Sequence, residues 1–172
     1  MRTLLLDRDG VINRDTHSFI RCVADWQALP GSLAAIVRAQ RAGFRVVVIS
    51  NQSGLARGLF GISDLHAVHR RLEDDLERIG GRIDAFFFCP HAPDDDCSCR
   101  KPGPGLLLEV QRRLGIELQD TPFIGDRLSD MQAARSAGAR PILVRSGIHG
   151  LADDLGEVEI YDNLAAAVQA LL

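Results

Sequence analysis

Short runs of apolar, β-branched and aromatic residues alternate along this chain with longer segments in which apolar residues recur every three or four positions. The short runs are typical of buried strands, and we expect strands at residues 3–6, 45–49, 85–88, 121–124, 141–144 and 157–161. The longer segments predict helices at residues 32–42, 63–79, 104–114 and 129–137. Serine at the start of most of these helices and glycine directly after each are the expected helix caps.

Strands that alternate with helices predict an α/β fold, a doubly wound and mostly parallel sheet of the Rossmann-like kind with helices on both faces. The length of 172 residues, the hydrophobic content of 46% and the lack of a linker or repeat predict one domain over residues 1–172. In the helix at 63–79 the apolar stripe runs through positions 65, 68, 72, 76 and 79. We therefore expect His66 and His69 to lie on the surface without a role.

The charge and hydropathy of the chain restrict its partners. The net charge of -3 at pH 7 argues against nucleic-acid binding, which requires an excess of basic residues on one face. There is no apolar signal segment and no run that approaches the ~18 apolar residues of a membrane span. These features predict a soluble, cytoplasmic protein, which we expect to be a monomer that acts on a small molecule without nucleic-acid or membrane partners.

Two carboxylates spaced by two residues, Asp7 and Asp9, follow the first predicted strand. Alternate side chains of an extended segment point the same way, so both can address one bound group, and Gly10 lets the chain turn sharply. One carboxylate can attack phosphorus while the other moves the proton, as in an aspartate phosphoryl-transfer site. A calcium loop also opens on this pattern, but its sixth and twelfth positions require Gly and Glu, and this chain has Ile12 and Ser18 there.

Polar residues also follow two other predicted strands. Ser50 and the segment 51–54 offer a hydroxyl and exposed backbone amides to phosphoryl oxygens, although an ordinary serine-rich turn is the alternative. Asp126 and Asp130 lie at a strand-to-helix junction, where single aspartates are common caps. Together with Asp7, Asp126 completes a hard oxygen site suited to Mg²⁺, which prefers a few carboxylates, water and substrate phosphate.

Only one of the 20 basic residues is a lysine, Lys101. A compact ammonium group can press against a carboxylate or phosphoryl oxygen as a point charge, whereas a broad guanidinium group cannot. In a chain so rich in arginine, the single lysine indicates a site that requires a compact positive charge and that arginine could not fill. An ordinary surface lysine is the alternative.

A separate group of soft metal ligands occupies residues 89–99. Its members are Cys89, His91, Cys97 and Cys99. Three thiolates and an imidazole suit tetrahedral Zn²⁺, and disulfides are the alternative. Because four protein ligands leave no open coordination position, we expect a structural zinc that stiffens the loop carrying Arg100 and Lys101.

These motifs occur in the order of the four motifs of the haloacid dehalogenase superfamily of phosphohydrolases, which the chain resembles from about residue 4 to residue 145. The motifs are Asp7-x-Asp9, Ser50, Lys101 and Gly125-Asp126-x-x-x-Asp130. More narrowly, segments 7–13, 51–58 and 99–102 and the zinc cluster resemble a zinc-containing branch whose members act on heptose bisphosphate or histidinol phosphate. Close relatives often have Thr in place of Ser50 and Lys in place of Arg127.

The resemblance implies a role for each motif. Asp7 would attack phosphorus and form an aspartyl-phosphate, and Asp9 would protonate the leaving alcohol and then activate water. The Mg²⁺ ligands would be Asp7, the backbone carbonyl of Asp9 and Asp126, with Asp130 orienting them from behind. Ser50 and Lys101 would hold the phosphoryl group.

The resemblance further implies a larger set of substrate contacts. They are Asp15, Thr16, His17, Ser18, Asn51, Gln52, Ser53, Arg57, Arg100 and Arg127. Many members of the superfamily carry a cap domain, but no gap between the motifs here is long enough to fold one. We therefore expect an open site whose specificity comes from the loops 13–27 and 54–61 and from the zinc loop, with Arg57 or Arg100 reaching a second phosphate.

The activity implied by this branch is removal of the 7-phosphate from heptose 1,7-bisphosphate, a step toward the lipopolysaccharide core, with Mg²⁺ as the catalytic metal. Hydrolysis of histidinol phosphate is the enzymatic alternative. A signalling receiver domain, from another class, also places an aspartate, a hydroxyl and a lysine around Mg²⁺. Such a domain lacks the second acid two residues after the nucleophile and has no reason to carry a zinc loop.

Overall fold

The computed structural model describes residues 2–148 and 155–172 and is built around a six-stranded sheet. The strands are β1 (Arg2–Leu6), β2 (Phe44–Asn51), β3 (Ala85–Cys89), β4 (Pro122–Gly125), β5 (Arg140–Val144) and β6 (Glu159–Tyr161). They lie in the order β3-β2-β1-β4-β5-β6, and every neighbouring pair is parallel. The predicted doubly wound α/β fold is therefore confirmed.

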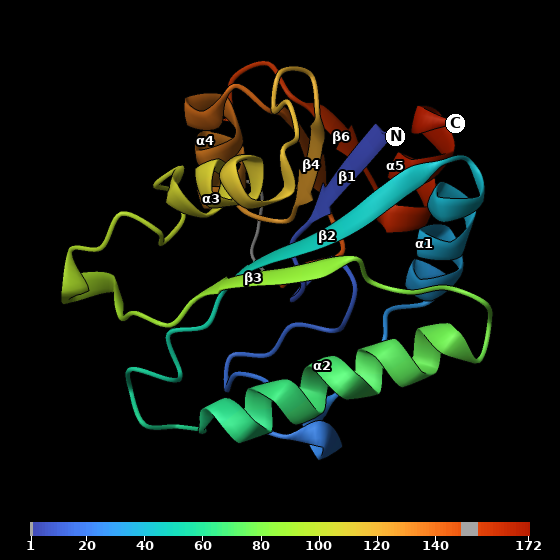
Figure 1. Cartoon of the computed structure of the whole chain (residues 1–172). Helices are drawn as coiled ribbons and strands as arrows, with labels where there is room; N and C mark the ends of the chain where they lie inside the picture. The colour runs from blue at the N-terminus through green and yellow to red at the C-terminus, as the bar shows by residue number, and fades with distance from the viewer. Residues whose placement is uncertain (1, 149–154) are drawn as a thin grey trace.

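Helices cover both faces of the sheet (Figure 1). They are α1 (Ser32–Arg41), α2 (Ile62–Glu77), α3 (Gly105–Leu114), α4 (Leu128–Ala137) and α5 (Leu164–Leu171), with short 3₁₀ turns η1 (Val23–Asp25) and η2 (Pro93–Asp95). Apolar residues of α1, α2 and α5 share a core cluster on one face, and those of α3 and α4 share a second cluster on the other. The site therefore rests on a sheet that is held from both sides.

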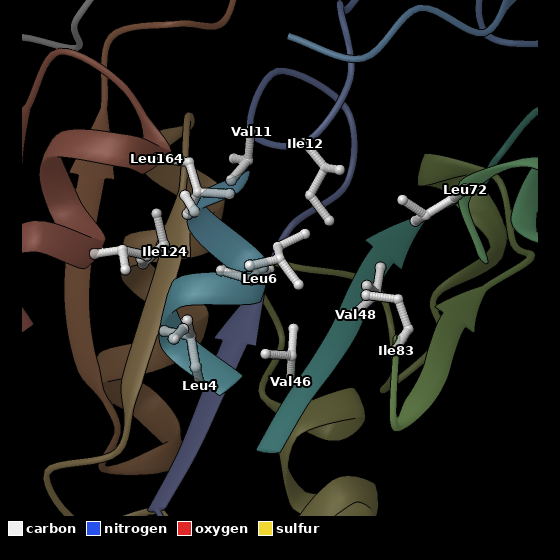
Figure 2. Close-up of a cluster of buried hydrophobic side chains, with 14 of the residues drawn as sticks. Leu4, Leu6, Val11, Ile12, Val46, Val48, Leu72, Ile83, Ile124 and Leu164 are labelled. Carbon is white, nitrogen blue, oxygen red and sulfur yellow. The ribbon is translucent and has the colours of Figure 1, made fainter. Parts of the chain in front are cut away.

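The alternation of side chains along each strand divides the two cores. Leu4 and Leu6 of β1 belong to the cluster under α1, α2 and α5, whereas Leu5 belongs to the cluster under α3 and α4. Figure 2 shows the first cluster, in which Leu72 of α2 and Leu164 of α5 are among the labelled side chains. Such two-sided burial explains why the strands are continuous apolar runs.

Several details differ from the sequence prediction. Residues 164–171 form α5, which was not predicted, with the Asn163 side chain accepting a hydrogen bond from the Ala166 amide. None of the predicted serine caps is a cap, because Ser32, Ser63 and Ser129 lie inside α1, α2 and α4 and follow the N-cap residues Gly31, Gly61 and Arg127. The Ser32 hydroxyl instead donates to the Ile12 carbonyl at 2.7 Å. The expectation that His69 lies on the surface was wrong.

His69 is 6% exposed and stacks on Phe86 of β3, with ring centroids 4.2 Å apart. The physical reason is helical periodicity, since position 69 is four residues after the buried Leu65 and so lies on the same face. Ile79, which was assigned to the buried stripe, lies after the end of α2 and is 45% exposed.

The strand order places a topological switch point between β1 and β4, because the chain runs to β2 on one side of β1 and later returns to β4 on the other. Ligands of open α/β sheets bind beyond the carboxyl ends of the strands at such a point. No cap domain is inserted in the part of the chain that the structure describes. Among the same residues, no helix combines the length and the hydropathy needed to span a membrane.

Candidate active site

The predicted catalytic residues meet at the switch point. Asp7 directly follows β1, Ser50 is the second-last residue of β2 and Asp126 directly follows β4. A cavity of ≈ 460 Å³ opens at this edge of the sheet, and Asp7, Asp9 and Lys101 are in its wall. The parallel topology thus brings together residues that are separated by more than a hundred positions in the sequence.

Lys101 lies between two buried carboxylates. Its Nζ atom is 2.7 Å from Asp7 Oδ1 and 2.6 Å from Asp130 Oδ1. Burial disfavours the ammonium ion, but the two carboxylates outweigh burial and raise the pKa of Lys101, so the side chain is charged. The lone lysine therefore occupies the kind of position that the sequence predicted, a point charge among oxygens.

The pKa of Asp7 is raised although Lys101 is its partner. Burial has the largest effect on its pKa, and the charges of Asp130 and Asp9 add to it. These influences outweigh the attraction of Lys101 and raise the pKa of Asp7 to about 7.

Asp126 is a buried carboxylate without a hydrogen-bond donor. Both of its oxygens are buried and lack a hydrogen-bond partner among the described residues, and Arg127 Nε is 3.8 Å from Oδ1. Burial, followed by the charges of Asp7 and Asp130, raises the pKa of Asp126 to about 8. An orphaned carboxylate of this kind is costly unless a cation compensates it.

The carboxylate oxygens of Asp7, Asp126 and Asp130 lie within 4.8 Å of one another, which fits a hard cation. Asp130 is already engaged on both oxygens, since Oδ1 pairs with Lys101 and Oδ2 accepts the amides of Asp126 and Arg127 at 3.2 and 3.1 Å. Asp7 and Asp126 are therefore the side chains that fit Mg²⁺, and Asp130 fits the predicted orienting position behind them.

Two glycines make room for this metal-binding edge. A Cβ atom on Gly10 or on Gly147 would collide with Asp126 Oδ2. Gly10 has φ +86, in the left-handed region that favours glycine, and its carbonyl accepts a hydrogen bond from the Ser146 hydroxyl at 2.7 Å. The segment after β5 therefore closes one side of the site, a contact that the sequence prediction missed although the end of β5 lies at the same sheet edge.

Asp9 is held by donors from three directions. Arg8 donates to both Asp9 oxygens, Asn13 Nδ2 donates to Oδ1 at 2.9 Å, and Gln52 Nε2 donates to Oδ2 at 3.2 Å. Burial would raise the pKa of Asp9, but the charge of Arg8 and these hydrogen bonds outweigh it and lower the pKa below its ordinary value. Arg8 was not predicted to belong to the site, and Asn13 was predicted only as the first residue of the specificity loop 13–27.

The residues after β2 are linked to the catalytic groups. The Gln52 amide also donates to Ser50 Oγ at 3.2 Å, so Ser50 and Asp9 share one donor. The Asn51 side chain makes a reciprocal pair with the Lys101 backbone, donating to its carbonyl and accepting from its amide, both at 3.0 Å. Asn51 thus fixes the backbone from which the Lys101 side chain extends.

The cavity lining contains most of the predicted substrate contacts. Its lining includes Asp15, Thr16, His17, Asn51, Gln52, Ser53, Arg100 and Arg127. Arg127 Nη2 is 2.6 Å from Asp15 Oδ2, which ties the loop after β1 to the segment before α4. Ser18 and Arg57 are exposed residues outside the described lining.

The four predicted zinc ligands converge on the loop that follows β3, which projects from the sheet in Figure 1. The Cys89 Sγ atom is 3.6 Å from Cys97 Sγ and 3.1 Å from Cys99 Sγ, and His91 Nδ1 is 3.3 Å from Cys99 Sγ. These separations suit a tetrahedral ion, for which Zn–S bonds give sulfur–sulfur edges of about 3.8 Å. All three cysteines are free thiols, so the disulfide alternative is not supported.

Comparison with known proteins agrees with this geometry. A family model described as HAD-hydrolase-like matches residues 98–168. The chain is 49% identical over 147 residues to a D-glycero-beta-D-manno-heptose-1,7-bisphosphate 7-phosphatase of Bordetella bronchiseptica, with 86% of this chain and 82% of that protein covered. It is 42% identical over 172 residues to a protein of the same name from Pseudomonas aeruginosa, with 98% and 97% covered.

A solved structure of D,D-heptose 1,7-bisphosphate phosphatase from B. bronchiseptica, complexed with magnesium and phosphate, has a TM-score of 0.92 and 44% identity to this chain. The match covers 99% of this chain and 98% of that one. Similarity of this extent leaves no support for the receiver-domain alternative. The chain belongs to the D-glycero-β-D-manno-heptose-1,7-bisphosphate 7-phosphatase family, a branch of the haloacid dehalogenase-like hydrolases.

Proposed function

We propose that this chain is a phosphatase that removes the 7-phosphate from D-glycero-β-D-manno-heptose 1,7-bisphosphate. The observation that carries the proposal is the pairing of Asp7 with Lys101 in the wall of the cavity, with Asp9 two residues after Asp7. The carboxylate of Asp126, which has no hydrogen-bond partner among the described residues, lies close to that of Asp7. A nucleophile, an acid that becomes a base, and fixed positive charge are what phosphoryl transfer through a carboxylate requires. The names of the family relatives support the substrate.

Asp7, the backbone carbonyl of Asp9 and Asp126 would hold Mg²⁺. The unpartnered Asp126 oxygens and the raised pKa of Asp7 are the features of this chain that a divalent cation relieves. When bound, the ion offsets the negative charge that accumulates on the phosphoryl oxygens. The Asp130 carboxylate keeps both Asp126 and Lys101 in place, because it accepts a hydrogen bond from the Asp126 backbone amide and pairs with the Lys101 ammonium group.

In the first half-reaction a carboxylate oxygen of Asp7 forms a bond to phosphorus while the bond from phosphorus to the sugar oxygen breaks, and Asp9 gives that oxygen its proton. Lys101 and Ser50 hold the phosphoryl oxygens. In the second half, Asp9 takes a proton from water as the water oxygen attacks the aspartyl-phosphate. Phosphate then leaves and Asp7 is restored, and the proton that Asp9 takes from water replaces the one that it gave to the sugar oxygen.

The substrate is selected by loops around an open cavity, because no cap is present among the described residues. Arg100 lines the cavity directly before Lys101, and its Nη1 atom is 3.5 Å from the His91 carbonyl, so zinc would fix the loop from which Arg100 reaches the substrate. A guanidinium group offers bidentate contacts to phosphate or hydroxyl oxygens. We take the chain to be one domain over residues 1–172, monomeric and cytoplasmic, serving lipopolysaccharide core synthesis.

The test is a comparison of kcat/KM for D-glycero-β-D-manno-heptose 1,7-bisphosphate and histidinol phosphate. We expect a large preference for the bisphosphate, release of the 7-phosphate alone and no turnover after magnesium is stripped. Arg100→Ala should lower the preference ~10-fold or more, since loss of a charged donor costs about 1.5–3 kcal/mol. Arg41→Ala is the control, because Arg41 is an exposed arginine in the last turn of α1 and is outside the described cavity lining.

Faster turnover of histidinol phosphate would refute the substrate while leaving the aspartyl-phosphate chemistry intact. Asp7→Asn and Asp9→Asn test that chemistry separately. Loss of the nucleophile removes the covalent route, and loss of the acid and base should cost ~100-fold or more. Near wild-type turnover of carefully purified Asp9→Asn would refute the role given to Asp9.

A further inference from the structure

Arg8 has no part in the mechanism described so far, although it stands between the two catalytic aspartates in the sequence. Its side chain is 0% exposed, and arginine is almost never fully buried unless it is paired. Its charge acts on the buried His69 of α2, so the guanidinium group lies toward the face of the sheet on which Leu4 and Leu6 pack. A guanidinium group at this position has lost its water and must be compensated by the protein.

The compensation comes from Asp9 itself. Arg8 Nε is 3.1 Å from Asp9 Oδ1, and Nη2 is 3.0 Å from both Oδ1 and Oδ2. Arg8 therefore binds the Asp9 carboxylate from the core side. The Asp9 side chain remains 20% exposed and lines the cavity, so the opposite side of the carboxylate faces the space where substrate binds.

The backbone of Arg8 stabilises the turn that allows Arg8 to pair with Asp9. Its carbonyl accepts hydrogen bonds from the amides of Val11, Ile12 and Asn13 at 3.3, 2.9 and 3.2 Å. Side chains of adjacent residues in a strand point to opposite faces, so Arg8 and Asp9 can pair only because the chain turns there. The Asn13 side chain, which ends this turn, also donates to Asp9.

We propose that Arg8 is a positioning residue for proton transfer: its buried guanidinium group holds the Asp9 carboxylate so that it faces the oxygen of the leaving sugar. This inference rests on the acid role given to Asp9 in the proposed function. The planar fork of arginine supplies contacts to both carboxylate oxygens, which a lysine ammonium group cannot supply from the same position. Arg8 acts through Asp9 and does not touch the phosphoryl group.

The leaving group of the substrate separates this role from a purely structural one. A sugar oxygen needs the proton from Asp9 when its bond to phosphorus breaks, whereas p-nitrophenolate leaves without one. The value of kcat/KM covers the steps up to formation of the aspartyl-phosphate, so it isolates proton donation from the later hydrolysis. Both substrates are measured with the wild-type enzyme and with Arg8→Met, Arg8→Lys, Asp9→Asn and the double variant Arg8→Met/Asp9→Asn.

Arg8→Met should lower kcat/KM by ~30-fold or more for heptose bisphosphate and by ~3-fold or less for p-nitrophenyl phosphate, with Arg8→Lys between wild type and Arg8→Met. The double variant should lose no more than Asp9→Asn alone, since residues that act as a unit are not additive. Arg45→Met is the matched control. Arg45 is a half-buried arginine at the opposite end of β2 from Ser50, and its loss should leave both reactions unchanged.

Equal losses with both substrates in Arg8→Lys, or losses in the double variant that add, would overturn the proposal. If Arg8→Met does not fold, as a thermal melt would reveal, Arg8→Lys decides alone, because it keeps the buried charge and loses the fork. A wild-type enzyme that hydrolyses another sugar phosphate but not heptose bisphosphate would refute the proposed substrate only. The Arg8 comparison is then made with that sugar phosphate.

Discussion

The burial of His69 predicts a specific pH dependence of stability, which the variant His69→Phe should remove. The ring is 6% exposed, stacks on Phe86 and lies edge-on to Phe88 at 6.2 Å between centroids. Burial has the largest effect, and with the nearby charge of Arg8 it lowers the pKa of His69 to about 3 from an ordinary 6.5. Phenylalanine keeps an aromatic ring against Phe86 but cannot take up a proton.

The sign and size follow from linkage. Because the pKa is lower in the folded state, the unfolded chain binds more protons between pH 6.5 and 3, and stability falls as the pH falls through this range. At pH 5 the pH is about 1.5 units below the pKa of the histidine in the unfolded chain, whereas the folded histidine is still neutral. This difference lowers the free energy of unfolding by about 2 kcal/mol. Above pH 7 the effect vanishes, since both states are neutral.

The assay is urea unfolding at pH 7.5 and pH 5.0 for wild type, His69→Phe and His66→Phe. Wild type should lose about 2 kcal/mol more of its unfolding free energy than His69→Phe does between these pH values. The zinc ligands and carboxylates are the same in both proteins, so their own pH dependence cancels in the comparison. His66 is exposed on the same helix and serves as the control. An equal loss in wild type and His69→Phe would refute the burial of a neutral ring.

Three further predictions concern the site. Lys101→Arg should lower turnover ~100-fold or more, because a guanidinium fork cannot replace a point charge between two buried carboxylates, and near-normal steady-state rates would contradict this reasoning. Gly147→Ala should raise the magnesium concentration for half-maximal activity ~10-fold, because the new methyl group collides with Asp126. An unchanged magnesium titration would show that the backbone at position 147 shifts without displacing Asp126. Elemental analysis should find about one zinc per chain, and Cys97→Ser should lose zinc and lower the melting temperature, while full occupancy in that variant would contradict the ligand set.

Much of this architecture could be predicted from the sequence because its signals are local. Apolar runs mark the central strands of a parallel sheet, and glycine marks the helix ends at Gly115 and Gly138, both in the left-handed region. The rule that ligands bind at the carboxyl ends of such strands then brings Asp7, Ser50 and Asp126 together without any knowledge of distances. The helix at 164–171 lacks these signals, since no glycine stop follows it and few polar residues interrupt its alanines.

The features that the sequence did not reveal depend on tertiary contacts. An arginine between two aspartates is expected to be solvated, and its complete burial follows from the turn after β1 and from its pairing with Asp9. The ion pair of Arg127 with Asp15 joins residues 112 positions apart, and the sequence around either residue does not indicate its partner. Periodicity could have placed His69 in the core, because it lies four residues after Leu65 on the buried stripe.

The distribution of charge explains how two aspartates so close in sequence can do different work. Arg8 serves Asp9 and lowers its pKa, whereas Asp7 shares Lys101 with Asp130 and has its pKa raised. Opposite shifts would ordinarily mark the group with the raised pKa as the acid. Here the raised pKa of Asp7 reflects burial beside other carboxylates, so a divalent cation at this edge reverses it and leaves an ionised nucleophile. Asp9 then becomes the acid because the negative phosphoryl group of the substrate, arriving on its exposed side, favours the protonated carboxyl.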